Sequence, residues 1–126
     1  MRVCENIEKA RSHIMEIKMQ ILSKALLIVN VTIDSEFEAE WNDWYDKVHL
    51  PEILSCPGFR GAARYVCQLN NGRHYLTIYE IESPQAIESV EFNKRRGWGK
   101  FKEKVQASVR VFNQISYMED TNENKK

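Results

Sequence analysis

The stretch that decides the fold is Phe59–Glu82, with the sequence FRGAARYVCQLNNGRHYLTIYEIE. It holds two runs rich in β-branched and aromatic residues on either side of Asn70-Asn71-Gly72, a combination typical of a tight β-hairpin. We predict one strand over Phe59–Gln68 and its partner over Arg73–Glu82. In the second strand Tyr75, Thr77, Tyr79 and Ile81 share one face, and His74, Leu76 and Ile78 share the other.

The segments on either side of the hairpin complete an alternating pattern. The remaining elements are expected in this order: a strand over 25–33, a helix from about Glu36 toward Pro51, a second helix from Pro84 that is interrupted around 97–99, and a last strand over 107–118. We expect Pro51 to break or kink the first helix. The order β-α-β-β-α-β predicts an α+β, ferredoxin-like fold, with a four-stranded antiparallel sheet and both long helices on one face.

The chain of 126 residues is long enough for one domain with its own core, predicted over 24–118. An amphipathic helix is predicted over 1–23, where apolar residues recur at heptad spacing, and a flexible polar tail over 119–126. Such a helix could lie on its own domain, pack on a second subunit or dock a partner protein. The sequence leaves these three possibilities open.

Composition excludes several classes of protein. Eighteen basic residues balance 18 acidic ones, so no net field attracts nucleic acid or an anionic membrane. No apolar run is long enough to cross a bilayer, and the 3 cysteines lack CxxC spacing. We therefore expect a cytoplasmic protein with neither nucleic-acid nor membrane partners.

Charge is nevertheless segregated along the chain. Residues 34–52 hold seven acids and one base, whereas residues 91–104 hold six bases and two acids. These stretches could be two solvated faces that attract each other. Alternatively, the bases could line the approach of an anionic substrate; the candidates are Arg95, Arg96, Lys100 and Lys102.

The strands predict a second subunit. Residues 26–29 and 75–81 are apolar or aromatic in both registers, although helices cover only one face of this fold. Strands that are apolar on both faces need a second cover. We therefore predict a homodimer in which the open faces of two sheets pack together.

The densest chemical pattern lies on the first helix. Trp41, Tyr45 and His49 are spaced by four residues and form one row along it. Aromatic rings can wall a small-molecule pocket, and imidazole can accept a proton near neutral pH. A purely structural histidine is the alternative. Asp46 is expected to face solvent, with lysine or water as its partner.

Polar residues on the strands give further candidates. Asn30 and Arg64 are polar groups in strands and are therefore either members of a hydrogen-bond network or ligand contacts; with Tyr65 and Tyr79 they are the candidates for substrate binding. Strand parity places Arg64 and Tyr65 on opposite faces of the sheet. No cofactor or metal motif occurs, so no cofactor and no metal ligand are predicted. A lone base in an aromatic pocket can support proton abstraction, isomerisation, dehydration, cyclisation or cofactor-free oxygenation.

One longer motif resembles a known family. Phe37-x-x-x-Trp41-x-x-Trp44-Tyr45-x-x-x-His49-Leu50-Pro51-Glu52-x-Leu54-x-x-Pro57-Gly58-Phe59, followed by Ala63-Arg64-Tyr65, is similar to the EthD-like branch of the dimeric α/β-barrel superfamily. The resemblance implies two ferredoxin-like subunits whose sheets close into a shared barrel. It also implies that His49 is the motif histidine and candidate base, with Tyr45 and Trp41 as pocket aromatics.

Relatives of that superfamily include cofactor-free monooxygenases, isomerases, cyclases, dehydratases and haem-degrading enzymes, so the resemblance implies a kind of site rather than one reaction. The leading hypothesis is a small homodimeric enzyme of isomerase, cyclase or dehydratase type that acts on an aromatic or polyketide-like molecule. In it His49 accepts a proton, Tyr45 hydrogen-bonds the developing oxyanion, and Trp41, Tyr65 and Tyr79 pack on the substrate. A non-catalytic ligand-binding or accessory protein and a cofactor-free monooxygenase are the alternatives.

Overall fold

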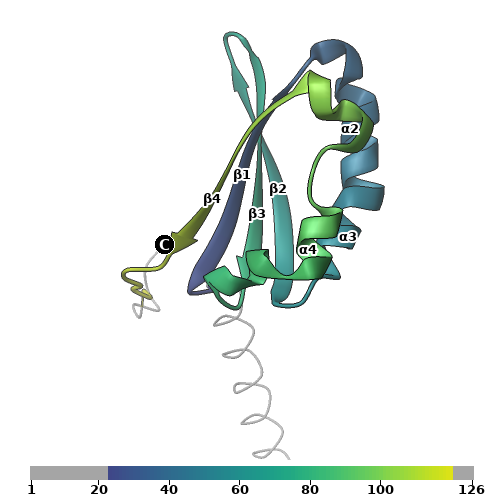
Figure 1. The fold of residues 1–126 in the computed structure, drawn as a ribbon. Helices are drawn as coiled ribbons and strands as arrows, with labels where there is room; N and C mark the ends of the chain where they lie inside the picture. The colour runs from purple at the N-terminus through teal and green to yellow at the C-terminus, as the bar shows by residue number, and fades with distance from the viewer. Residues whose placement is uncertain (1–22, 121–126) are drawn as a thin grey trace, which may run out of the picture.

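The computed structural model describes residues 23–120, and the helix predicted over 1–23 lies outside them apart from Ser23. The predicted β-α-β-β-α-β order is confirmed (Figure 1). The strands are β1 (Ala25–Ile33), β2 (Phe59–Leu69), β3 (Gly72–Ile81) and β4 (Val105–Asn113). The helical segments are η1 (Ser35–Phe37), α2 (Glu38–Trp44), η2 (Tyr45–His49), α3 (Leu50–Leu54), η3 (Pro84–Glu88), α4 (Val90–Arg95) and η4 (Gly99–Lys104).

The four strands form one antiparallel sheet in the order β2-β3-β1-β4. The predicted hairpin is present, with Leu69 opposite Gly72 across the loop. Gly72 has a φ of 123°, a conformation that favours glycine, so the hairpin depends on this residue. In the register between β2 and β3, Arg64 lies opposite Thr77 and Tyr65 lies opposite Leu76.

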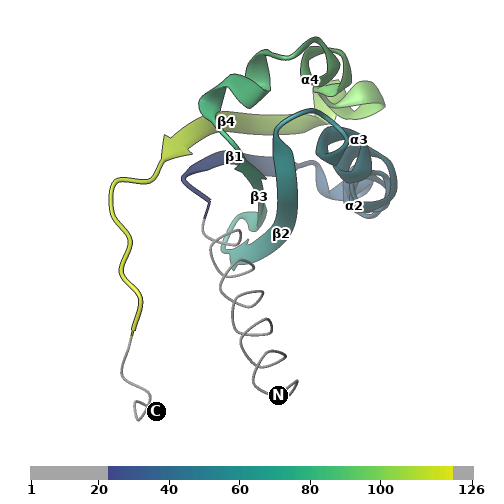
Figure 2. The ribbon, with the colours of Figure 1, turned by 90° about the horizontal axis from the view of Figure 1, so that it is seen from below.

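All helical segments lie on one face of the sheet, as Figure 2 shows end-on. The strand residues that face them form the core with aromatic side chains from the helical layer; these include Leu27, Val29, Val31, Trp41, Tyr45, Tyr75, Tyr79, Ile81, Phe92 and Phe101. The opposite face carries the alternate strand residues. Leu26, Ile28, Leu76 and Ile78 are only half-buried there, and Tyr65 is 54% exposed.

The first half of the helical layer corrects one prediction. Pro51 does not break the helix, which continues from the 3-10 turn η1 through α2, η2 and α3 to Leu54. The segment η2 is a π-helical turn in which the Leu50 N–H bonds the Tyr45 carbonyl, five residues earlier. Proline lacks an N–H and its ring would crowd the carbonyl of Lys47 in a regular α-helix. The wider π turn accommodates it.

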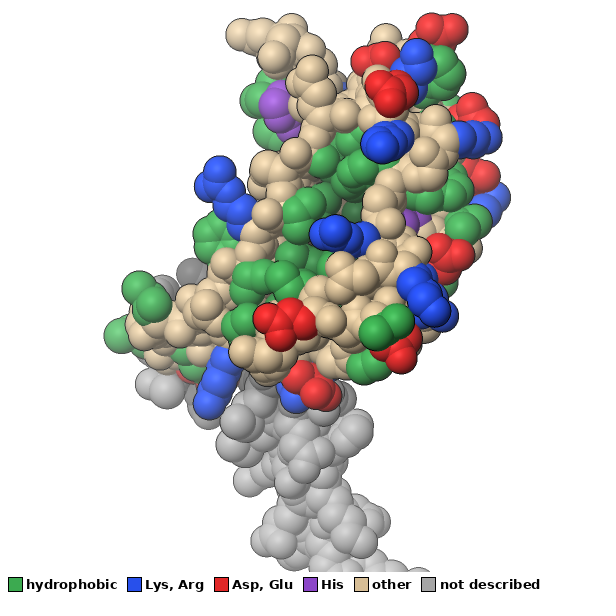
Figure 3. Space-filling view, in the orientation of Figure 1, with side chains coloured by type: hydrophobic (Ala, Val, Ile, Leu, Met, Phe, Trp, Pro, Cys, Tyr) green, Lys and Arg blue, Asp and Glu red, His purple; other side chains and the backbone are tan. Residues whose placement is uncertain are grey.

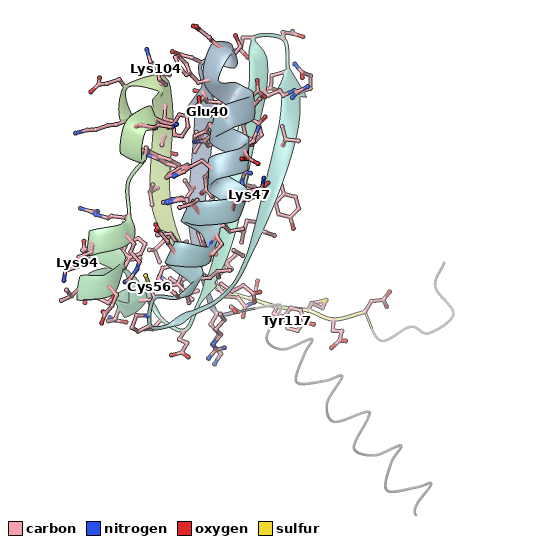
Figure 4. The ribbon with its side chains drawn as sticks, turned by 90° about the vertical axis from the view of Figure 1, so that its right-hand side faces the viewer. Glu40, Lys47, Cys56, Lys94, Lys104 and Tyr117 are labelled. Carbon is pink, nitrogen blue, oxygen red and sulfur yellow. The ribbon has the colours of Figure 1, made fainter. Side chains whose placement is uncertain are left out.

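The second half is discontinuous, as predicted. Three short helices replace one long one, and the chain turns at Gly97 and Gly99, whose φ values of 110° and 54° favour glycine. The predicted end of the last strand at Met118 is wrong: β4 stops at Asn113. The bond from the Gln114 N–H to the Lys24 carbonyl, 2.7 Å, is the last one toward β1, and the tail then leaves the sheet, as Tyr117 shows in Figure 4.

Candidate active site

A cavity of about 570 Å³ lies between the sheet and the two halves of the helical layer. Figure 3 shows a hollow floored with hydrophobic side chains between β4 and the helices. The lining residues are Leu27, Val29, Tyr45, His49, Ile53, Tyr79, Ile87, Phe92, Asn93, Arg96, Gly97, Trp98 and Val109. A largely apolar cavity of this size with a few polar groups suits a small organic ligand.

The π turn brings the two principal candidates to this cavity. Tyr45 and His49 are its first and last residues, and both are buried against the sheet side of the helix. On a regular α-helix residues four apart drift by about 40° around the axis at each step. The wider turn offsets that drift, so Trp41, Tyr45, His49 and Ile53 all remain buried in one row.

His49 is held by ring packing. Its ring stacks on Trp44 with centroids 4.7 Å apart, meets Tyr45 edge-on at 4.9 Å and lies 5.6 Å from Trp98. Its side chain makes no hydrogen bond to any residue in the described range 23–120. The imidazole is therefore oriented by its neighbours, while its ring nitrogens remain available to a ligand in the cavity.

The surroundings keep His49 uncharged. The side chain is 5% exposed, and this burial lowers its pKa from 6.5 to about 4, with a further contribution from the positive charge of Arg64. At neutral pH the ring is in the form that accepts a proton.

A pair of phenols forms the other polar feature of the cavity. The hydroxyls of Tyr45 and Tyr79 are 3.2 Å apart and hydrogen-bonded to each other. Burial raises the pKa of both phenols, so both stay protonated at neutral pH. The side chain of Thr77 also hydrogen-bonds Tyr45, so three hydroxyls share two bonds and one O–H of this network remains to bond another group.

Arg64 packs against the ring of Tyr45 and does not itself line the cavity. Its guanidinium stands 4.2 Å from the centre of the Tyr45 ring and donates to Asp46 and Asn42, each at 2.7 Å. The expectation that Asp46 pairs with lysine or water is wrong, because the long arginine side chain reaches across from β2. Arg64 holds Tyr45 in place and adds the charge that disfavours protonation of His49.

The other residues predicted to contact a substrate do not line the cavity. Trp41 is fully buried and meets the rings of Tyr45 and Tyr75 edge-on. It supports Tyr45 without lining the cavity. Asn30 and Tyr65 lie on the open face of the sheet, on the far side from the cavity. The prediction that both join the same site as His49 is corrected for a single chain, because strand parity directs them away from it.

The second half of the helical layer supplies lining residues that the sequence analysis did not name as one site. Trp98 and Arg96 flank Gly97 at the break between α4 and η4, and Asn93 lies one helical turn before. The signal was present in the interrupted helix, since a tryptophan between two glycines has no helical face to join. The sequence pattern therefore predicted a break around Gly97–Gly99, but not where that break lies relative to the sheet.

No three His, Cys, Asp or Glu side chains among residues 23–120 are grouped as metal ligands would be. None of the helices described is long and apolar enough to span a membrane.

Comparison with known families and structures gives the class of protein. Residues 24–115 match the family described as "Domain of unknown function (DUF4286)", and the chain belongs to that family. Comparison with curated proteins gives no match.

Several solved structures share the fold. An EthD family protein from Bacillus halodurans is 11% identical, with a TM-score of 0.56, and 72% of this chain covers 99% of that one. SnoaB from Streptomyces nogalater, a cofactor-independent oxygenase crystallised as the N63A mutant, is 12% identical with a TM-score of 0.57, covering 78% and 100% of the two chains. HapK from Hahella chejuensis is 14% identical with a TM-score of 0.58, covering 76% and 97%. The predicted resemblance to the EthD-like branch is thereby confirmed at the level of fold.

Proposed function

We propose that the chain is a small-molecule enzyme in which His49 takes a proton from a carbon acid bound in the cavity. The observation that carries the proposal is the shared cavity of an uncharged, unbonded imidazole and the Tyr45–Tyr79 hydroxyl pair. An enolate forms when a proton leaves the carbon beside a carbonyl group. A hydroxyl of the Tyr45–Tyr79 pair, with Thr77 completing its hydrogen bonds, would donate to the negative oxygen of that enolate.

The low pKa of His49 restricts the substrate. A base with a pKa of about 4 removes protons only from carbon acids that are strongly activated, such as a CH₂ between a carbonyl group and an aromatic ring. Phe92, Ile87 and Trp98 in the cavity lining suit an aromatic body. We therefore place the reaction in the isomerase, cyclase or dehydratase class, with an aromatic or polyketide-like ketone as substrate.

A cofactor-free oxygenase is a second candidate, supported by the similarity in fold to SnoaB, a cofactor-independent oxygenase. The same proton transfer would begin the reaction. Dioxygen would add to the carbanion to give a hydroperoxide, and loss of water would leave a carbonyl, so that CH₂ and O₂ become C=O and H₂O. Oxygen uptake with 2-tetralone, without added metal or flavin, separates this reaction from simple proton exchange.

We also propose a homodimer. The half-buried Leu26, Ile28, Leu76 and Ile78 on the open sheet face, with Tyr65 and Phe112 about half exposed, form an apolar surface suited to a second copy. Sedimentation equilibrium should give the mass of two chains. A monomer at all concentrations would remove this part of the proposal and leave the cavity unaffected.

The proton transfer can be measured before the natural substrate is identified. In D₂O the protein should accelerate exchange of the α protons of 2-tetralone, followed by NMR. His49→Gln should lower that rate by about 100-fold or more, since it removes the base. His74→Gln, on the open sheet face, is the matched control and should exchange at the wild-type rate. Wild-type exchange in folded His49→Gln would show that the histidine is structural, and no exchange with wild-type protein would favour a binding protein.

A further inference from the structure

Among the described residues that line the cavity, Arg96 is the one with a charged side chain, since His49 is neutral. No acidic residue is among the lining residues of the described chain. The backbone N–H of Arg96 bonds the Phe92 carbonyl at 2.8 Å and fixes the residue at the end of α4. Its guanidinium makes no hydrogen bond or ion pair within residues 23–120, and the side chain is exposed. A fork of five N–H donors is therefore free at the cavity mouth.

The neighbouring bases are occupied or lie elsewhere. Arg95 donates to the carbonyl of Glu91, and Lys100 pairs with Glu40 on α2. Lys104 lies over the ring of Phe37 at 4.9 Å, and Lys94 lies on α4 at the edge of the molecule (Figure 4). Of this basic stretch, Lys100 pairs with the acidic helix and Arg96 is the member that lines the cavity.

The inner end of the cavity does not favour a permanent anion; the enolate of the proposed reaction would form there only together with a protonated His49, as an ion pair. Tyr45, Tyr79 and His49 are buried and uncharged there, among apolar side chains. An anionic group placed beside them would lose its hydration and gain no cation at the surface of the cavity. A charge on the ligand would therefore be placed at the mouth.

We propose that the ligand is an aromatic or polyketide-like carboxylate, with its carboxylate on Arg96 and its neutral oxygen near the Tyr45–Tyr79 pair. The inference rests on the proposed function, because it assigns the substrate class of the same cavity. The planar guanidinium can bond both oxygens of a carboxylate at once. The ring between the two ends would pack on Trp98 and Phe92. This arrangement fixes which end of the substrate reaches His49.

The test compares two probes of nearly the same shape by isothermal titration calorimetry, the anion 2-naphthoate and its neutral analogue 2-naphthamide. Wild-type protein should bind the anion at least tenfold more tightly than the amide. Arg96→Gln should remove that preference by weakening the anion alone, and Arg96→Lys should restore part of it. Arg95→Gln is the matched control, because it removes the adjacent charge without altering the cavity lining, and it should leave both affinities unchanged.

Each other result has a definite meaning. Equal affinities of the wild type for the two probes overturn the carboxylate assignment and leave the cavity as a site for neutral ligands. Equal losses in Arg96→Gln and Arg95→Gln overturn it as well, since they indicate a general surface field. Trp98→Ala should weaken both probes. If neither probe binds, or if Trp98→Ala changes neither affinity, the cavity itself is not the site, and the proposed function fails with the inference.

Discussion

The two halves of the helical layer contribute differently to one cavity. Ser35–Leu54 is a continuous helical stretch whose inward row, from Trp41 to Ile53, is almost completely buried. Pro84–Lys104 is three short helices joined by turns, and its contributions to the cavity include the half-buried Trp98 and the exposed Arg96. The first half holds the candidate reacting groups by packing, whereas the second presents groups that a ligand can reach. Stability and ligand recognition should therefore separate between the two halves.

The largest expected effect compares two tryptophans. Trp41→Ala removes a fully buried ring that supports Tyr45, and we expect the free energy of unfolding to fall by about 4 kcal/mol. Trp98→Ala removes a half-buried ring, and a loss of about 1 kcal/mol is expected. Urea unfolding followed by circular dichroism measures both. Similar losses in the two variants would contradict the division between a supporting half and a ligand-contacting half.

A smaller effect appears when the pH is lowered. The pKa of His49 is about 4 in the folded protein and 6.5 in the unfolded chain, so the unfolded chain binds more protons between these values. The contribution of the uncharged His49 to the free energy of unfolding is therefore fully present above pH 6.5. It decreases toward pH 4, by up to about 3 kcal/mol in total.

Denaturant unfolding at several pH values measures this decrease. His49→Phe should flatten the profile over that range, whereas His74→Gln on the open sheet face should retain the wild-type slope. A His49→Phe profile as steep as that of the wild type would show that other groups cause the loss.

The smallest effect concerns the ion pair that joins the two halves. Lys100 on η4 pairs with Glu40 on α2, and both side chains are more than half exposed. Exposed pairs contribute little, so Glu40→Gln should change the free energy of unfolding by no more than about 0.5 kcal/mol. It should also leave 2-naphthoate binding unchanged. A clear loss of binding would show that the position of the second half depends on this pair.

Much of the fold could be predicted because its signals are local. Alternation along the strands, the Asn70-Asn71-Gly72 turn and the break at Gly97 each depend on neighbouring residues. A break at Pro51, one of the two predicted alternatives, is wrong because the rule that proline ends a helix assumes α geometry. The π turn over Tyr45–His49, which ends two residues before Pro51, removes the clash, and nothing in the local composition distinguishes the two outcomes.

The candidate site could be predicted only in part. The four-residue spacing of Tyr45 and His49 placed them together, and the structure brings both to one cavity. The hairpin register could also have separated Tyr65 from Tyr79, since Tyr65 pairs with Leu76, whose face is opposite to that of Tyr79. Arg96 and Trp98 could not be placed, because their approach to His49 depends on how a broken segment crosses the sheet.

The π turn has a consequence for how this site is inherited. Substitutions at Trp44, Asp46 or Val48 would leave the number of residues between Trp41 and Ile53 intact. Loss of a single residue there would restore α geometry, in which the ring of Pro51 crowds the carbonyl four residues earlier. Tyr45 and His49 would then be three residues apart, about 60° from each other around the helix axis, and their common alignment toward the cavity would be lost. The site is thus encoded in a length of chain as well as in residue identities, and a single-codon deletion is the change that it tolerates least.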